Sequence, residues 1–465
     1  MEPQKVYLVG AGPGNLGLIT VRGLEILKQA DVVIHDYLID RQLLGQARVD
    51  AELICTKELG KFRYEKSQDE AQASICDSMV KKAKEGKRVI RLKNGDPTVF
   101  ARLEEELYAL TENNIEYEIV PGISAGTAAA AYMGIPLTEK HVSSNVVFVT
   151  GHEPQGHQGI NWKHLAQCGT IVLYMAVKSI SQVVEQLIAA GKPSDTPAAV
   201  ISHIGSVDMK TASGTLETIQ SAALKQSISP PAVFIIGDSA LFETQYNWFK
   251  KNKKIVFTGL SDERYFLSGS YFHIPMIQIL PLQDYTELDN HICDIRRYNW
   301  LVFASRYGVQ YFFERLFALG YDARHLNDAR IAAVGASTAG KLREFGICAD
   351  LVPNRESSAG LLEAFQHVDL QGKTLFMPRS DLSDKGLEGG FIQHGARVTS
   401  CVAYRNVPAE NLPPLDLSHF DEIILTSPSS VRSVVNTYKQ IPKTVAVRCI
   451  GDVTRKEARI WGLVD

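Results

Sequence analysis

Short runs of apolar, β-branched residues alternate with amphipathic stretches from one end of the chain to the other. In the first half, helical periodicity marks residues 73–85 and 179–190, and strand-like runs occupy residues 6–10, 31–35, 89–92, 118–120, 146–150, 171–175, 198–201 and 233–237. Strands that alternate with helices are typical of α/β domains. Continuous apolar strands also fit a sheet that is covered on both faces. We therefore predict an α/β fold with a largely parallel sheet.

A domain boundary is expected near residue 250, where residues 250–254 are basic and polar and a new strand-like run at 255–258 follows. The second half repeats a shorter theme, with strand-like runs at 300–305, 331–335, 374–377, 423–427 and 445–451. Small or hydroxyl-bearing residues follow these runs, at the position where open α/β sheets bind ligands. We predict two domains, residues 1–249 and 254–465, joined by a solvated linker.

Composition excludes several classes of function. The formal net charge is −3, which argues against a general nucleic-acid binder. The first five residues are polar, and no apolar run approaches the length of a membrane span. The seven cysteines form no C-x-x-C pair, which favours reduced structural thiols. We expect a soluble cytoplasmic protein that binds no nucleic acid, no membrane and no metal.

A glycine-rich loop follows the first predicted strand. Gly12, Gly14 and Gly17 satisfy G-x-G-x-x-G, and Asp36 ends the next strand, as the ribose-binding acid of a dinucleotide site does. Two features oppose that interpretation. Pro13 has no backbone N–H for a pyrophosphate, and the helix is predicted to begin only after a cap at Thr20. A dinucleotide site and a tight loop without a ligand both stay open on this motif alone.

The loop belongs to a longer series of motifs. The sequence reads VGAGPGN at 9–15 with LIT at 18–20, VIHDYL at 33–38, RLKNGDPTVF at 91–100, VPGISA at 120–125, GIPLT at 134–138, VTGH at 149–152, TIVLYM at 170–175 and PPAVFIIG at 230–237. In this order and spacing, residues 5–249 resemble the tetrapyrrole (precorrin) methylase family, and most closely its uroporphyrinogen III methyltransferases. The resemblance implies a two-lobed α/β domain.

The resemblance also implies a cofactor and its contacts. The cofactor is S-adenosylmethionine, and its implied binding residues are Pro13, Gly95, Asp96, Val99, Ser124, Ala125, Met175 and Gly205. Gly95 permits close backbone approach just past a strand end. Asp96 as a plain turn residue and Met175 as plain core packing are the alternatives.

The implied reaction is C-methylation of uroporphyrinogen III to precorrin-2, on the way to siroheme, cobalamin or another modified haem. A pyrrole carbon attacks the sulfonium methyl group and the tetrapyrrole loses a proton, so the enzyme supplies alignment and a base. The resemblance suggests Asp36 as proton acceptor and Lys61 as proton donor. It also places Arg102 and Glu105 at the substrate, although a surface i,i+3 ion pair is the alternative. Methylases of this family are implied homodimers.

Several positions depart from the family pattern. The G-K-R-x-G-x-H motif is replaced by residues 60–66, which end in Lys66, and G-R-G-G-E-E is replaced by residues 101–106. L-T-H-R has Glu139 in place of histidine, and Y-M-G has Ala176 in place of glycine. These departures concern efficiency and substrate more than the class of cofactor.

The second half resembles uroporphyrinogen III synthase. The motifs are LVFAS at 301–305, AVGASTA at 333–339, GARV at 395–398 with VAYR at 402–405, LTSPSS at 425–430 and CIGDVT at 449–454. The resemblance implies two flavodoxin-like lobes, about 254–283 with 408–465 and about 284–405, joined by a two-strand ladder. The family continues through another strand and helix, so this domain is expected to be C-terminally short.

The implied reaction closes linear hydroxymethylbilane with inversion of ring D. Hydroxyl groups after strand ends are expected to bind the substrate carboxylates, namely Ser305, Ser337, Thr338, Ser429 and Thr454. Tyr404 is expected to assist departure of the hydroxyl group as a weak acid. A helix cap is the alternative for each hydroxyl.

Three hypotheses follow from the sequence. The chain is a bifunctional enzyme, or it is an active methylase with a synthase-like domain that only binds tetrapyrrole. The third hypothesis is a nucleotide-binding dehydrogenase or regulatory module, which Pro13 and the later motifs oppose.

Overall fold

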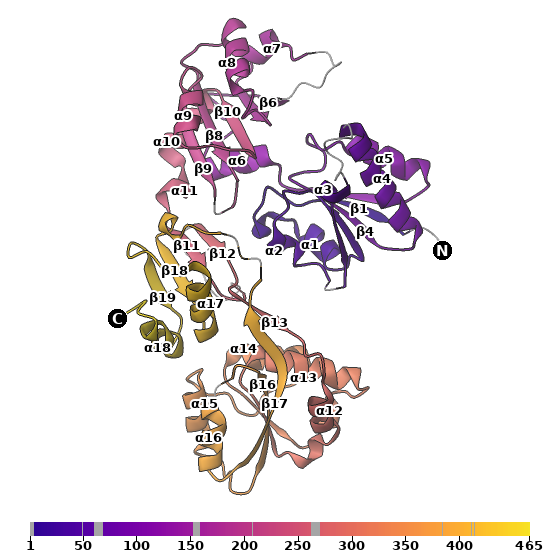
Figure 1. Cartoon of the computed structure of the whole chain (residues 1–465), viewed down its shortest axis with the longest axis vertical. Coiled ribbons are helices and arrows are strands. Elements are labelled where there is room, and N and C mark those ends of the chain that lie inside the picture. The colour runs from indigo at the N-terminus through magenta and orange to yellow at the C-terminus, as the bar shows by residue number, and fades with distance from the viewer. Residues whose placement is uncertain are drawn as a thin grey trace. The chain divides into compact units, whose positions relative to one another are not determined.

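The computed structural model describes residues 4–48, 50–59, 68–151, 159–206, 208–261, 270–383, 385–410, 412 and 414–465. The chain divides into two compact units, residues 1–253 and 254–465. Each unit contains two sheets with flanking helices, so the predicted α/β class is confirmed (Figure 1). Only residues 252 and 253 separate the last helix of the first unit from the first strand of the second.

The first sheet of the first unit is parallel throughout. Its order is β3-β2-β4-β1-β5, built from β1 (Val6–Gly10), β2 (Val32–His35), β3 (Glu52–Cys55), β4 (Val89–Lys93) and β5 (Tyr117–Val120). In the centre, Val6 pairs with Val89 and Gly10 with Lys93. Helix α4 (Gln68–Lys84) and helix α5 (Leu103–Glu112) cover one face, and α1 (Val21–Leu27) and α2 (Arg41–Leu44) cover the other. A short helix, α3 (Thr56–Leu59), follows β3.

The second sheet of this unit is mixed rather than largely parallel. Its order is β6-β7-β10-β8-β9, built from β6 (Val146–Thr150), β7 (Thr170–Tyr174), β8 (Pro197–Ser202), β9 (Lys210–Thr215) and β10 (Ala232–Ile236). Only β6 and β7 run parallel, because β8 returns directly as β9 without a helical crossover and β10 enters between β7 and β8. The helices here are α6 (Ala125–Met133), α7 (Trp162–Ala166), α8 (Ile180–Ala189), α9 (Ile219–Lys225), α10 (Phe242–Tyr246) and α11 (Trp248–Lys251).

The basic segment at the boundary corrects one prediction. Lys250 and Lys251 are not linker residues but the last residues of α11, whose N-cap Asn247 accepts a hydrogen bond from the Lys250 backbone N–H. The Lys250 ammonium lies 2.6 Å from the buried Glu243 carboxylate. Lys250 therefore partly neutralises a buried acid. The sequence had predicted only solvated charges in this run.

The second unit also contains two sheets. The smaller is parallel with the order β12-β11-β18-β19, from β11 (Lys254–Phe257), β12 (Ser270–His273), β18 (Glu422–Leu425) and β19 (Ala446–Cys449). The larger has the order β13-β17-β16-β14-β15, from β13 (Ile277–Leu280), β14 (Trp300–Phe303), β15 (Arg330–Ala333), β16 (Thr374–Ser380) and β17 (Arg397–Pro408). Strands β13 and β17 are antiparallel and carry the chain between the two lobes.

Helices flank both sheets of the second unit. They are α12 (Thr286–Cys293), α13 (Arg306–Ala318), α14 (Ala336–Glu344), α15 (Ser358–Phe365), α16 (Gly386–Gln393), α17 (Pro428–Tyr438) and α18 (Asp452–Ile460). The larger lobe holds an apolar core with many phenylalanines, among them Phe303, Phe312 and Phe313, which are fully buried.

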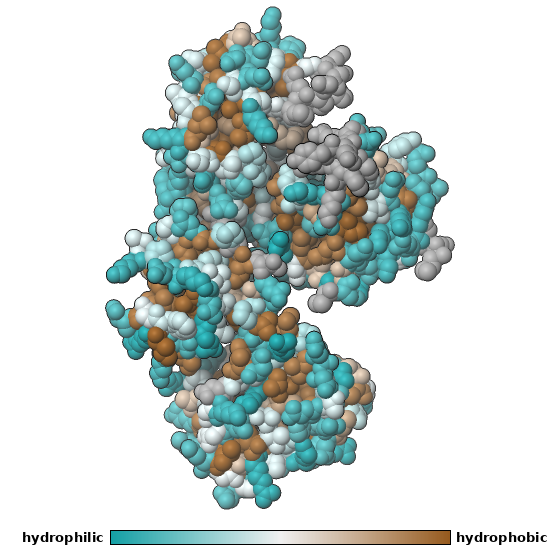
Figure 2. Space-filling view, viewed as in Figure 1, coloured by the Kyte–Doolittle hydropathy of each residue, from teal (hydrophilic) through white to brown (hydrophobic). Residues whose placement is uncertain are grey.

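The surface mixes polar and apolar residues. Figure 2 shows hydrophilic side chains over much of the visible face, with apolar residues in separate groups. Among the described residues, no helix has both the length and the apolar character that a membrane crossing needs. All seven cysteines are unpaired in the structure, and Cys76 and Cys401 are buried.

Candidate active sites

A cavity of about 670 Å³ lies in the first unit. Residues that follow β1, β2, β4 and β5 line it, together with residues from the second sheet, and this matches the strand-end position where α/β sheets bind ligands. Eight residues that the sequence predicted for one site line this cavity, namely Pro13, Asp36, Gly95, Asp96, Val99, Ser124, Ala125 and Met175. Gly205 follows Ile204, which lines the cavity, and a Cβ on Gly205 would meet Asn15 at 3.0 Å.

The glycine-rich loop pairs with the turn after β4 instead of presenting a helix N-terminus. The Gly12 N–H donates to the Gly95 carbonyl at 3.2 Å, and the Gly95 N–H donates to the Gly12 carbonyl at 2.8 Å. Helix α1 begins at Val21 with Thr20 as its N-cap, as predicted. Its N-terminus therefore lies past the glycines, which removes the usual pyrophosphate contact of a dinucleotide fold.

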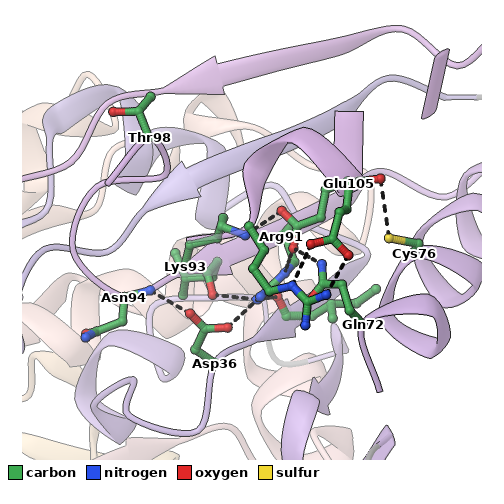
Figure 3. Close-up of polar contacts among 12 residues, drawn as sticks. Asp36, Gln72, Cys76, Arg91, Lys93, Asn94, Thr98 and Glu105 are labelled. Atoms are coloured by element: carbon green, nitrogen blue, oxygen red, sulfur yellow. Dashed lines mark hydrogen bonds and ion pairs between the residues drawn. The ribbon is translucent and has the colours of Figure 1, made fainter. Parts of the chain in front are cut away.

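Asp36 follows β2 and is held from two sides. Its Oδ1 lies 2.5 Å from Arg91 Nη2, and its Oδ2 accepts the Asn94 backbone N–H at 2.9 Å (Figure 3). Burial would raise the pKa of Asp36, but the Arg91 charge and the Asn94 hydrogen bond outweigh it and lower the pKa. Asp36 is therefore an ionised carboxylate. Both of its oxygens already accept hydrogen bonds from Arg91 and Asn94, and this does not favour a role in binding a ribose hydroxyl.

Asp96 fixes the turn after β4. One carboxylate oxygen accepts the backbone N–H and hydroxyl of Thr98, and the other accepts the Gly122 N–H at 2.9 Å. Burial would raise the pKa of Asp96, but these hydrogen bonds lower it. The contact ties the turn after β4 to the loop after β5. A Cβ on Gly122 would overlap the Gly95 carbonyl oxygen at 2.2 Å, so only glycine fits this approach.

The second sheet contributes Tyr174 at the end of β7. Its hydroxyl lies 2.6 Å from the Ser124 hydroxyl and accepts the Gly126 N–H at 2.8 Å, in the first turn of α6. Burial raises the pKa of Tyr174, so its proton stays bound at neutral pH. Sequence reasoning did not single out Tyr174, although it immediately precedes Met175.

Met175 is not a core residue. Its exposed fraction is 56%, it lines the cavity, and its φ of 55° lies in the left-handed region. A long side chain in this conformation is uncommon and strained. Met175 therefore lies on the cavity wall rather than in the core, and its role in cofactor binding stays a prediction.

Arg102 and Glu105 form the surface ion pair that the sequence offered as the alternative. Arg102 Nε lies 2.5 Å from Glu105 Oε1, and its Nη2 lies 2.6 Å from Asp69. Their neighbour Ala101 lines the cavity. Their role at the substrate stays a prediction, and Lys61 and Lys66 lie outside the described residues.

The other departures have local roles. The Glu139 carboxylate accepts the His141 backbone N–H at 2.8 Å, and the Glu139 backbone pairs with Ser143 in both directions. Ala176 is buried, and a Cβ on Gly151 would overlap it at 2.6 Å.

A buried group of charges beside the cavity was missed. Arg91 and Lys93 on β4 and Glu106 on α5 have exposed fractions of 3%, 1% and 0%. The sequence did contain evidence for buried charge here, because two basic residues, two positions apart, interrupt an otherwise apolar strand. Their acidic partner could not be assigned, since α5 offers three consecutive glutamates.

In the second unit, Ser305 and Tyr404 come together. The Ser305 hydroxyl caps α13 by accepting the Gly308 N–H at 2.9 Å, and it lies 2.8 Å from the Tyr404 hydroxyl. Tyr311 stacks on Tyr404 with ring centroids 5.7 Å apart. Burial raises the pKa of Tyr404, although the bond to Ser305 opposes this. Tyr404 therefore holds its proton and is a weak acid.

The other predicted hydroxyls are spread over both lobes. Thr338 and Thr454 are buried within the first turns of α14 and α18, and Ser337 is half-buried beside Thr338. Helix α18 begins at Asp452, two residues before Thr454. Ser429 accepts a hydrogen bond from Asn406 Nδ2 at 3.3 Å, which connects α17 to β17.

One group of side chains has the residue types of a metal site, since ligand atoms of Glu287, His291 and Cys401 lie within 4.8 Å of one another. However, Arg297 Nη2 and Tyr298 Oη lie 2.6 and 2.9 Å from His291 Nδ1. Burial raises the pKa of Cys401 to about 12. The Arg297 cation against the imidazole does not favour a metal, and the absence of a bound metal stays a prediction.

Comparisons with known proteins follow the same division. Residues 5–220 match the Tetrapyrrole (Corrin/Porphyrin) Methylases, and residues 267–464 match Uroporphyrinogen-III synthase HemD. The porphyrin biosynthesis protein HemD of Ruminiclostridium josui is 32% identical over 498 residues, with 100% of this chain and 95% of the relative covered. The uroporphyrinogen-III C-methyltransferase of Bacillus subtilis (strain 168) is 40% identical over 253 residues, with 54% and 96% covered. A solved uroporphyrin-III C-methyl transferase from Thermus thermophilus, complexed with S-adenyl homocysteine, is 28% identical, with 50% and 92% covered and a TM-score of 0.43.

Proposed function

We propose that the chain is a bifunctional enzyme. It belongs to the family of the porphyrin biosynthesis protein HemD, and it joins a tetrapyrrole methylase region to a uroporphyrinogen-III synthase region. It cyclises hydroxymethylbilane to uroporphyrinogen III and methylates that product to precorrin-2 with S-adenosylmethionine. One observation carries the methylase proposal. Eight residues expected for one site, from loops far apart in the sequence, line a single cavity at the strand ends.

The cavity fits the cofactor in size and chemistry. A volume of about 670 Å³ lies within the range of small-molecule sites. Apolar Pro13, Val99 and Met175 share the wall with Asp36 and Asp96. The pKa values of Asp36 and Asp96 are both lowered, so both carboxylates are ionised and the wall carries negative charge. Negative charge suits a sulfonium cation. When bound, S-adenosylmethionine supplies the methyl group as an electrophile.

The protein's own groups align the substrate and receive its proton. The turn at Gly95 and Asp96 is rigid because Asp96 ties it to Gly122, and this rigidity helps to fix the reacting partners. We assign Asp36 as the proton acceptor. Because its pKa is lowered, it is ionised at neutral pH but is a weak base, so it works best through position.

The synthase proposal rests on Tyr404 and the hydroxyls around it. Tyr404 keeps its proton at neutral pH because burial raises its pKa. Ser305 holds the phenol in place at 2.8 Å. We assign Tyr404 as the weak acid that assists loss of the substrate hydroxyl, and we assign carboxylate binding to Ser305, Ser337, Thr338, Ser429 and Thr454.

The decisive experiment is an anaerobic assay of the full chain with hydroxymethylbilane, with and without S-adenosylmethionine. Products are oxidised and identified by absorbance, mass and isomer analysis. We expect the III isomer without cofactor and a dimethylated product with it. If only the I isomer forms while added uroporphyrinogen III is methylated, the second region is a non-catalytic binding domain. If neither product forms, both assignments are wrong.

We further propose a cytoplasmic homodimer that assembles through the methylase region. Exposed apolar side chains near the end of that region, including Leu241, Tyr246 and Trp248, supply a surface of suitable chemistry. Light scattering of the full chain should give twice the monomer mass of 51.4 kDa. A monomer at micromolar concentration would contradict the proposal.

A further inference from the structure

Strand β4 brings two cations into the interior of the first unit. Arg91 and Lys93 are two positions apart, so both point to the sheet face that α4 and α5 cover. The strand lies between β2 and β1, and both side chains are almost completely buried. Buried charges need partners, since water no longer compensates them.

Glu106 on α5 is the shared partner of both cations. Its Oε1 lies 2.9 Å from Arg91 Nε, and its Oε2 lies 2.5 Å from Lys93 Nζ. Gln72 on α4 donates to the same Oε1 at 3.4 Å. Glu106 thus joins β4, α4 and α5 at one buried point.

The line of contacts continues from Arg91 to the cavity. Arg91 Nη2 reaches the Asp36 carboxylate at 2.5 Å (Figure 3). Arg91 Nη1 donates to the carbonyls of Ile34 and Leu92. Lys93, Glu106, Arg91 and Asp36 therefore form one chain of two cations and two anions, which we call the buried relay. Only Asp36 among the four lines the cavity.

The geometry depends on the planar guanidinium. Arg91 contacts Glu106 through Nε and Asp36 through Nη2, so the fixed fork sets one carboxylate relative to the other. A lysine at this position has one ammonium group and cannot hold both. Since buried ion pairs often add little net stability, their presence here fits a positional role.

We propose that Glu106 and Arg91 are positioning residues that fix the Asp36 carboxylate against the tetrapyrrole during methylation. This inference rests on the proposed methylase function. Neither residue lines the cavity, so they act through Asp36 and not on the substrate.

Two double variants separate position from charge. K93M/E106Q removes one charge of each sign and leaves an amide oxygen for Arg91 Nε, whereas K93M/E106L removes the same charges and that acceptor too. We expect K93M/E106Q to keep kcat within about threefold of the parent. K93M/E106L should lose about 10- to 100-fold in kcat, since a misplacement near 1 Å has effects of that size. The Kd for S-adenosylmethionine, measured by calorimetry, should change less than kcat, because Asp36 is only one of the many residues that line the cavity.

Two further variants complete the test. R91K keeps the charge but cannot bridge the two carboxylates, so kcat should fall and the acid limb of its pH profile should move to higher pH, because Arg91 lowers the pKa of Asp36. E243Q is the matched control, since Glu243 is a buried acid paired with Lys250 away from the cavity lining. It should leave kcat unchanged.

The outcomes distinguish this inference from the proposed function. A parent chain that forms no methylated product overturns the proposed function itself. If the parent is active and K93M/E106L binds cofactor and turns over like K93M/E106Q, the buried relay does not position Asp36. Should K93M/E106L fail to fold, R91K decides, and parental kcat in R91K overturns the inference.

Discussion

Asp36 in the first unit and Tyr404 in the second are both polar groups at a sheet, but their surroundings are opposite. Charged and backbone groups hold Asp36, and its pKa is lowered. The side-chain contacts of Tyr404 are neutral, with the Ser305 hydroxyl on one side and the Tyr311 ring stacked on it, and burial together with the nearby Asp381 charge raises its pKa. One site keeps its group ionised and the other keeps its group protonated.

The difference shows how many secondary-structure elements each site needs to hold its functional group in place. The Asp36 site needs β2, β4, α4 and α5 together, because a buried charge tolerates no missing partner. The Tyr404 site needs one hydroxyl, which a helix cap already supplies. Removal of the bridging cation at the first site should therefore lower the free energy of unfolding, whereas removal of the Tyr404 hydroxyl should mainly lower the activity of the second site.

The largest expected effect follows from Arg91→Met. The change leaves Glu106 and Asp36 without their bridging cation and should cost about 3–5 kcal/mol in the free energy of unfolding of the first unit. Urea unfolding followed by circular dichroism would measure it. The control is Arg22→Met, which breaks the surface pair with Glu118 and should cost at most about 1 kcal/mol. A loss below about 1 kcal/mol in the free energy of unfolding for Arg91→Met would contradict the prediction, because the buried pairs would then stabilise the fold no more than a surface pair does.

A smaller structural effect with a clear functional one is expected for Tyr404→Phe. Loss of one hydrogen bond to Ser305 should cost about 1 kcal/mol. Formation of the III isomer should fall by about 100-fold or more if the phenol is the acid, while methylation of added uroporphyrinogen III is unchanged. Tyr311→Phe is the matched control, because it keeps the ring stack and should change isomer formation less than about twofold. Equal effects of both changes would contradict the assignment.

The smallest effect is in the pH dependence of stability, and the two sites should differ in its sign. The folded pKa of Asp36 is lowered, so its contribution is present above its usual pKa near 3.8 and is lost as pH falls through the folded value. The folded pKa of Tyr404 is raised, so its contribution is present below its usual pKa near 10 and is lost as pH rises through the folded value.

Unfolding free energies of the parent, Asp36→Asn and Tyr404→Phe across pH would test these signs. The difference between parent and Asp36→Asn should shrink only on the acid side. The difference between parent and Tyr404→Phe should shrink only on the alkaline side. A difference that is constant with pH for either variant would show that the corresponding group has an ordinary pKa in the folded chain.

Much of the fold was predictable because buried strands need continuous apolar runs, and those runs are visible in the sequence. The runs at 89–92 and 171–175 correspond to β4 and β7 within a residue at their ends. Strand direction was not predictable. An apolar run does not state whether its neighbour is parallel, so the antiparallel pairing of β10 with β7 and β8 went unforeseen.

The candidate site was predictable where a motif carried it and not where partners meet only in space. The turn at Gly95 and Asp96 and the position of Met175 were found by resemblance, and the cavity brings them together. The bond from Asp36 to Arg91 spans 55 residues, and the choice of Glu106 among adjacent glutamates depends on the rotation of α5. Such choices depend on packing and are not encoded in spacing.

Strands β13 and β17 connect a whole lobe that is inserted between two strands of the smaller sheet, and this insertion affects the order in which the nascent chain can fold. Strand β11 is synthesised early, but its partner β18 follows about 165 residues later, after the whole inserted lobe between them. On the ribosome, the first unit and the larger lobe can therefore be complete while β11 and β12 still lack β18 and β19. During that interval β11 has no partner on the side that β18 later covers, so an unpaired strand edge with apolar side chains is exposed while synthesis continues.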